Sequence, residues 1–100
     1  MYLIHVRLRA PAGAVLPPGA AGLFASFADG GDGVEHIAVH RDAPGGPTLG
    51  LFLNAPALAA AEEAAERLAR RAVAGHASLR GFVVVAGEAS LVPGPWWDTG

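Results

Sequence analysis

The clearest pattern in this chain is the alternation of apolar with other side chains at every second position. Such alternation is typical of β-strands, because successive side chains point to opposite faces. It predicts strands over residues 2–9, 34–41 and 48–54. Residues 42–47 lie between the last two and contain two glycines and two prolines, at a length that suits a hairpin loop. The pattern therefore predicts an N-terminal strand and a separate hairpin.

Each predicted strand has one strongly apolar face and one mixed face. The apolar faces carry Ile4, Val6, Ile37, Val39, Leu49, Leu51 and Leu53. The mixed faces carry Leu3, His5, Arg7, His36, Ala38, His40, Gly50 and Phe52. Three of the chain's four histidines thus share one face of the predicted sheet. This mixed face is therefore the first candidate for a functional site.

Helical spacing appears in two segments. Residues 19–28 fit a short helix whose buried side would hold Leu23, Phe24 and Phe27. A longer helix is predicted over residues 55–74, with Asn54 as N-cap, Pro56 in the first turn and Gly75 just after the end. Its apolar stripe, at spacings of three and four, is Leu58, Ala61, Ala65, Leu68 and Ala72. A stripe rich in alanine lets this helix lie close to whatever it covers.

The C-terminal part begins with a continuously apolar stretch at residues 82–86. A strand that is apolar on both sides is expected where both of its faces are covered. Residues 87–88 are expected to form a turn or bulge, and residues 89–92 to continue the strand. Prolines and glycine at 93–95 then predict an irregular tail over about residues 93–100.

The predicted order of elements is strand, helix, strand, strand, helix, strand. This is the split βαβ arrangement, and it resembles the ferredoxin-like α+β fold, in which two helices cover one face of a four-stranded antiparallel sheet. The resemblance rests on element order over residues 2–92 and carries no family motif. It implies one ferredoxin-like domain over residues 1–100, and it constrains function weakly, because many functions share the fold.

The mixed face would leave apolar side chains uncovered in a monomer. These are Leu3, Phe52 and either Val83 and Val85 or Phe82 and Val84. Exposed apolar patches usually mark an interface or a ligand groove. The pattern is similar to the dimeric α+β barrel arrangement, in which two such sheets pack face to face. That resemblance implies a homodimer in which a C-terminal segment, including Trp96 and Trp97, embraces the partner chain.

Composition narrows the function classes. The formal net charge of −2 argues against a nucleic-acid partner. The absence of cysteine excludes disulfides and thiolate chemistry. We find no leader of the signal-peptide type and no apolar run of the length that a membrane helix needs, so we expect a cytoplasmic protein. All seven basic residues are arginine, and this bias, with abundant alanine, glycine and proline, indicates a GC-rich bacterial genome.

His5, His36 and His40 are the candidates for chemistry. A histidine can act as a general acid or base near neutral pH, or these side chains can be polar groups on a semi-exposed face. Within one strand, His36 and His40 are separated by about 13 Å, which excludes a shared metal ion. We expect the third strand to separate His5 from both of them. No metal and no cofactor are predicted.

The neighbours of the histidines allow a ligand or a partner chain. Gly50 and Ala38 are small and could make room for a ligand against Phe52, or let a second sheet approach. Arg7 or Arg41 could hold an anionic intermediate. Residues 29–35 contain acidic and glycine residues, but they lack the spacing of a calcium loop and are predicted to be a turn.

Two functions remain open at this point. One is a non-catalytic dimeric module that binds a protein or a small hydrophobic molecule as an accessory factor. The other is a cofactor-independent enzyme of the dimeric α+β barrel type, an oxygenase or cyclase acting on a hydrophobic small molecule. In the enzyme a histidine would move a proton. We favour the binding module, since the enzyme is implied by the architecture alone.

Overall fold

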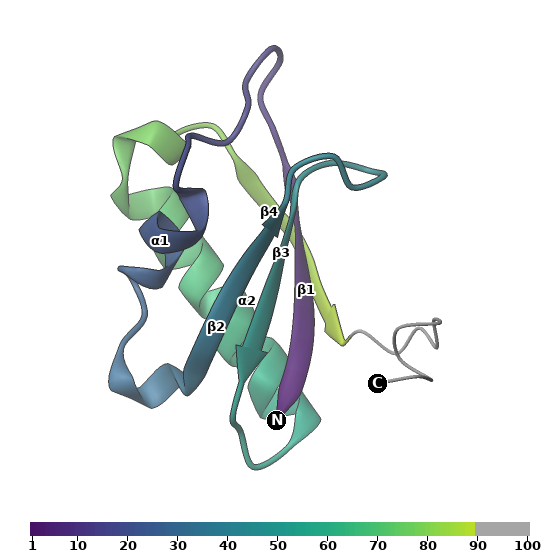
Figure 1. Ribbon diagram of the computed structural model, residues 1–100, viewed down its shortest axis with the longest axis vertical. Helices are drawn as coiled ribbons and strands as arrows, with labels where there is room; N and C mark the ends of the chain where they lie inside the picture. The colour runs from purple at the N-terminus through teal and green to yellow at the C-terminus, as the bar shows by residue number, and fades with distance from the viewer. Residues whose placement is uncertain (90–100) are drawn as a thin grey trace.

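The computed structural model describes the backbone of residues 1–89 and the side chains of residues 1–85, and it shows an α+β arrangement (Figure 1). The strands are β1 (Tyr2–Arg9), β2 (Val34–His40), β3 (Thr48–Leu53) and β4 (Val83–Ala89). The helices are α1 (Ala20–Ala25) and α2 (Leu58–Gly75), with short 3-10 turns η1 (Gly30–Asp32) and η2 (Ala77–Leu79). The tail predicted at residues 93–100 lies outside the described residues.

The four strands form one antiparallel sheet in the order β2-β3-β1-β4. Figure 1 shows α1 and α2 on the same side of this sheet. The predicted element order, the antiparallel sheet and the two helices on one face are therefore confirmed. The strands β1 and β3 lie at the centre, so their side chains are bordered by a strand on each side.

The core lies between the sheet and the helices. The apolar strand faces supply side chains that are fully buried, among them Ile4, Val6, Leu49, Leu51 and Leu53. The side of α2 that packs against them is mostly alanine, as predicted, and includes Ala61, Ala65, Leu68 and Ala72. Packing fixes the orientation of every strand, because a shift of one residue would move these side chains to the other face.

The ends of α2 differ from the prediction. The helix begins at Leu58 with Ala57 as N-cap, and no side chain caps it. Asn54 does not act as the N-cap, because the helix begins too far along the chain; its backbone N–H donates instead to Gly33 O at 2.9 Å, beside the start of β2. Pro56 consequently precedes the helix, and Gly75 is its last residue. Leu58, predicted in the buried stripe, is an exposed residue.

The other boundaries also move. The helix expected over 19–28 is limited to Ala20–Ala25, with Phe24 buried and Leu23 and Phe27 partly buried. The last strand runs through residues 87–88, where a turn or bulge was expected. The irregularity lies instead between Arg7 and Leu8, whose partners are Ala86 and Val84, so that Val85 is the extra residue on β4.

Around the start of β4, the described side chains alternate between the two faces of the sheet. Phe82 is buried in the core, and Val84 packs against it. Val83 and Val85 are 48% and 40% exposed, so they belong to the face away from the helices. In the described part of the chain, no helix is both long and apolar enough to cross a membrane.

Candidate functional site

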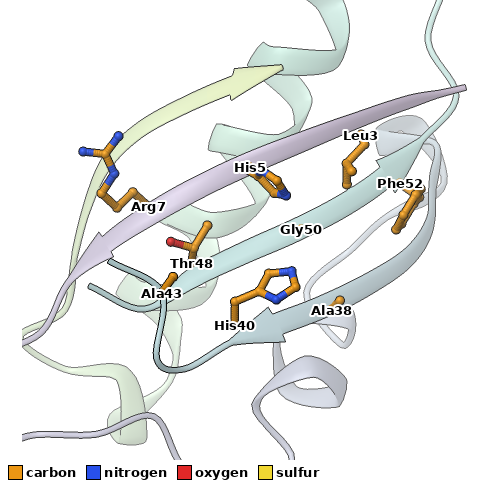
Figure 2. Close-up of a pocket in the computed structure, with 9 residues that line it drawn as sticks. All are labelled: Leu3, His5, Arg7, Ala38, His40, Ala43, Thr48, Gly50 and Phe52. Carbon is orange, nitrogen blue, oxygen red and sulfur yellow. The ribbon is translucent and has the colours of Figure 1, made fainter. Parts of the chain in front are cut away.

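A pocket lies on the sheet face that the helices leave uncovered (Figure 2). Its volume is about 650 Å³, within the usual range for sites that hold a small molecule. The residues that line it come from β1, β2, β3 and the loop between β2 and β3, and they are Leu3, His5, Arg7, Ala38, His40, Ala43, Thr48, Gly50 and Phe52. Seven of the nine belong to the mixed face that alternation predicted.

The strand register sets the order of these side chains along the pocket. Leu3 is paired with Phe52 at one end, and Arg7 with Thr48 at the other. Between them, Gly50 of β3 is the partner of His5 on one side and of Ala38 on the other. Figure 2 shows the same sequence, with Leu3 and Phe52 together and Arg7, Thr48 and Ala43 toward the opposite end.

His5 and His40 meet above Gly50. Their ring centroids are 5.9 Å apart and the rings are nearly perpendicular, at 87°. The expectation that the third strand keeps His5 away from both other histidines is therefore wrong for His40. The strand β3 does lie between them, but its residue at that position is a glycine, so there is no side chain to hold the rings apart.

At Gly50 there is room for a Cβ but for little more. A Cβ placed there would lie 3.5 Å from His40 Nε2, 3.5 Å from His5 Cδ2 and 3.6 Å from Leu3 Cδ1, all ordinary van der Waals distances. An alanine would fit, whereas a branched side chain would fill the gap between the two imidazoles. Gly50 thus forms the floor of the pocket, as the sequence suggested for it and Ala38.

His36 lies on the same face but does not line the pocket. Its ring is 6.0 Å from that of Phe52, centroid to centroid, with a tilt of 43°. The residue itself is exposed. Only two of the three candidate histidines are brought together, and His36 borders the apolar end of the site through Phe52.

The two candidate arginines occupy different places. The guanidinium of Arg41 donates to Leu16 O at 2.6 Å and to Pro17 O at 2.7 Å, so it ties the segment before α1 to the end of β2. Arg7 lines the pocket. Trp96 and Trp97 lie outside the described residues.

The loop between β2 and β3 forms one rim of the pocket and contributes Ala43. Leu8 N–H donates to Pro47 O at 2.9 Å, which holds the end of this loop against β1. Gly46 has φ of 121°, and a Cβ on it would lie 2.7 Å from Leu8 O. Only glycine permits this approach. The Gly-Gly pair in the sequence marked a turn, but not that the turn would border a site.

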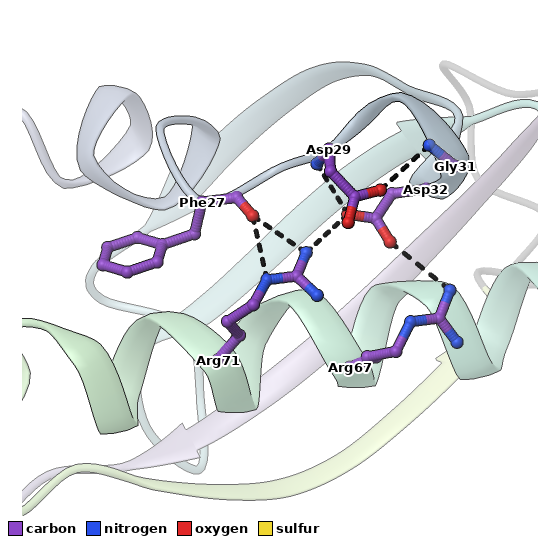
Figure 3. A network of polar contacts seen from close by, with 6 residues as sticks. All are labelled: Phe27, Asp29, Gly31, Asp32, Arg67 and Arg71. Carbon is purple, nitrogen blue, oxygen red and sulfur yellow. Dashed lines mark hydrogen bonds and ion pairs between the residues drawn. The ribbon is translucent and has the colours of Figure 1, made fainter.

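A second polar cluster lies on the helical side of the sheet and was not predicted (Figure 3). Asp32 in η1 is 2% exposed, and its carboxylate accepts from Asp29 N–H at 3.0 Å and from Arg71 Nη2 at 2.6 Å. Arg67 Nη2 lies 3.3 Å from the other carboxylate oxygen. Arg71 also donates to Phe27 O from Nε and Nη2. The predicted turn is thus fixed to α2 through Asp32, and β2 begins directly after it at Val34.

Burial alone would raise the pKa of Asp32. The hydrogen bond from Asp29 N–H, the hydrogen bond and charge of Arg71 and the hydrogen bond of Arg67 outweigh burial and lower that pKa below its ordinary value. The carboxylate is therefore ionised at neutral pH and has an anchoring role. Its side-chain partners are two guanidiniums, which can share one carboxylate through several N–H donors.

Residues 1–85 contain no group of three or more histidine or acidic side chains placed to hold a metal ion. The pocket offers two imidazoles, one guanidinium and one hydroxyl, which can donate or accept protons and hydrogen bonds. By register, Glu88 of β4 is the backbone partner of His5 on the side of β1 away from β3. The chemistry available at the pocket is that of acid, base and anion recognition beside an apolar wall.

Comparison with family models, with curated proteins and with solved structures finds no match to this chain.

Proposed function

We propose that this protein is a homodimeric binding module of the ferredoxin-like class whose uncovered sheet face holds a hydrophobic small molecule. The observation that carries the proposal is the pocket of about 650 Å³ on that face, with Leu3, Phe52 and two alanines among its lining residues. Ligand sites in proteins are typically concave and mostly apolar, with a few polar groups that set orientation. The placing of β1 and β3 at the centre of the sheet supports the ferredoxin-like class.

The same face supports a dimer. Val83 and Val85 are exposed on β4, beyond the residues that line the pocket, so the edge strand of the uncovered face also carries exposed apolar side chains. A bound ligand usually loses most of its accessible surface, but a single sheet can cover only one side of it. A second copy packed face to face would cover the other side, as in the dimeric α+β barrel arrangement.

The test of binding uses N-phenyl-1-naphthylamine, a neutral fluorescent probe of apolar sites. We expect wild-type protein to bind it, Gly50→Ala to bind it more weakly, and Gly50→Val to lose at least tenfold in affinity. The valine methyl groups would occupy the gap between His5 and His40, while valine itself suits a strand.

Gly22→Ala on α1 is the control, since it adds a methyl group on the helical side of the sheet, where nothing lies within 4 Å of it. Near-ultraviolet circular dichroism checks that each variant is folded. Failure of the wild-type protein to bind the probe, or equal binding by the Gly50→Val variant, would refute the proposed site.

The contact between His5 and His40 favours a second candidate. A cofactor-independent enzyme of the dimeric α+β barrel type, acting as an oxygenase or cyclase on a hydrophobic molecule, could use one imidazole as a general acid or base. His5→Asn and His40→Asn variants separate the two functions. If the protein is a binding module, both variants keep most of their affinity for N-phenyl-1-naphthylamine. If it is an enzyme, both variants bind the substrate but no longer turn it over.

A further inference from the structure

We propose that the pocket selects an amphipathic anion, a soluble small molecule with a flat apolar body and one acidic group. The apolar body lies against Leu3 and Phe52, and the acidic group lies at Arg7. This inference rests on the proposed binding function and adds the ligand's chemical class and its orientation.

The polarity of the pocket changes in one direction along the strands. On β1 the lining side chains are Leu3, His5 and Arg7 in that order, and on β3 their partners are Phe52, Gly50 and Thr48. Leu3 and Arg7 are four residues apart, which is about 13 Å in a strand. A ligand of that length meets two apolar side chains at one end and a guanidinium with a hydroxyl at the other (Figure 2).

The cationic end suits an oxyanion. A guanidinium carries five N–H donors in a fixed plane, so it can serve a carboxylate or sulfonate in addition to another acceptor. The Arg7 side chain passes the loop that forms the rim, where its Cδ is 3.7 Å from the position of a Cβ on Gly45. Thr48 Oγ1 donates its proton to Gly46 O at 3.2 Å, so Thr48 helps to fix the rim of the pocket, and Arg7 supplies the hydrogen-bond donors for the anion.

The middle and the apolar end suit a flat body. Because Gly50 has no side chain, the imidazoles of His5 and His40 meet over β3, and a flat ring can lie against them and over Ala38 of β2. The imidazoles of His5 and His40 stand beside Gly50, and the ring of Phe52 begins the apolar end. Aromatic groups pack favourably in such edge-to-face and offset arrangements. Because one end of the pocket carries the Arg7 guanidinium, an amphipathic anion fits it better than a purely hydrocarbon ligand.

A matched pair of probes tests this orientation. 1-Anilinonaphthalene-8-sulfonate has the same apolar body as N-phenyl-1-naphthylamine and adds one sulfonate. We expect Arg7→Gln to weaken binding of the sulfonate probe about tenfold, the lower part of the range for hydrogen bonds to a charged group. The same variant should change the affinity for the neutral probe less than twofold.

Arg9→Gln is the matched control, because Arg9 is an exposed arginine on the same strand face and does not line the pocket. It removes the same charge and should change sulfonate binding less than threefold. Equal weakening of both probes by Arg7→Gln, or no weakening of the sulfonate probe, would overturn the inference while the binding function stood. If the wild-type protein does not bind the neutral probe, the proposed function fails and this inference with it.

Discussion

At the scale of single residues, Asp32 is a buried charge with a structural task. It receives one backbone N–H and faces two guanidiniums, and through Arg71 it connects η1 to both α2 and the carbonyl of Phe27. A buried carboxylate would be unfavourable without such partners. The exposed ion pair between Glu66 and Arg70 on α2, at 2.9 Å, has no comparable burial and is worth little.

The lowered pKa of Asp32 makes stability depend on pH. A carboxyl whose pKa is lower in the folded than in the unfolded protein stabilises the fold above its unfolded pKa, which is near 3.8. That stabilisation is lost as the pH falls below about 5 and then through the folded pKa. Asp32→Asn should lower the free energy of unfolding at pH 7 by about 2 kcal/mol, because it removes charge-assisted hydrogen bonds.

Urea denaturation from pH 7 to pH 3 measures this difference. We expect the gap between wild type and Asp32→Asn to shrink toward acid pH, since the wild-type carboxyl becomes protonated there. Asp42→Asn removes an exposed carboxylate in the loop after β2 and serves as the control, with little change at either pH. A gap that stays constant down to pH 3 would contradict the assignment.

Alternation along a strand predicts the face on which a side chain lies, but not which side chains of different strands meet. It placed His5, His40, Gly50 and Phe52 on one face, because side-chain direction in a strand follows from sequence position. It did not reveal that His5 and His40 touch, since that contact depends on the register between β1, β3 and β2. The Asp32 cluster was missed for a similar reason, as its partners lie 35 and 39 positions away.

At the scale of elements, Phe27, which follows the end of α1, connects this part of the chain to α2. The ring of Phe27 lies against Gly75 at the end of α2, and its carbonyl accepts two hydrogen bonds from Arg71. Strand extents were predicted to within a few residues, because the apolar periodicity ends where a strand leaves the sheet. The ends of both helices were predicted less well, since Gly19 and Ala57, the N-caps of α1 and α2, make no side-chain capping hydrogen bond.

Two glycine-to-alanine changes distinguish these helices. Gly22 lies inside α1 with nothing within 4 Å of an added Cβ, so Gly22→Ala should raise the free energy of unfolding by about 0.5–1 kcal/mol through helix propensity. At Gly75 the added Cβ would lie 2.7 Å from Phe27 Cε1. Gly75→Ala should therefore lower stability, by about 1 kcal/mol or more, despite the same propensity gain. Urea unfolding of both variants checks the opposite signs, and a gain from Gly75→Ala would argue against the Phe27 contact.

At the scale of the whole molecule, the helices cover one sheet face and leave the other with both a pocket and an apolar border. The pocket occupies β1, β2 and β3, whereas Val83 and Val85 lie on β4 outside it. The proposed ligand site and the proposed dimer contact on β4 therefore involve adjoining but different side chains of one face. The two proposals can be separated by substitutions on β4 that leave the pocket residues untouched.

The double variant Val83→Glu, Val85→Glu makes that separation. Carboxylates at these positions would have to be buried against a second sheet, so we expect the variant to have the mass of a monomer by light scattering, at concentrations where wild type is a dimer. Val15→Glu, at a loop residue that is 83% exposed, should leave the dimer intact. Because a partner sheet would close the pocket, the monomeric variant should also bind N-phenyl-1-naphthylamine severalfold more weakly than wild type. A wild-type protein that is monomeric, or a double variant that remains dimeric, would show that this face does not form the dimer.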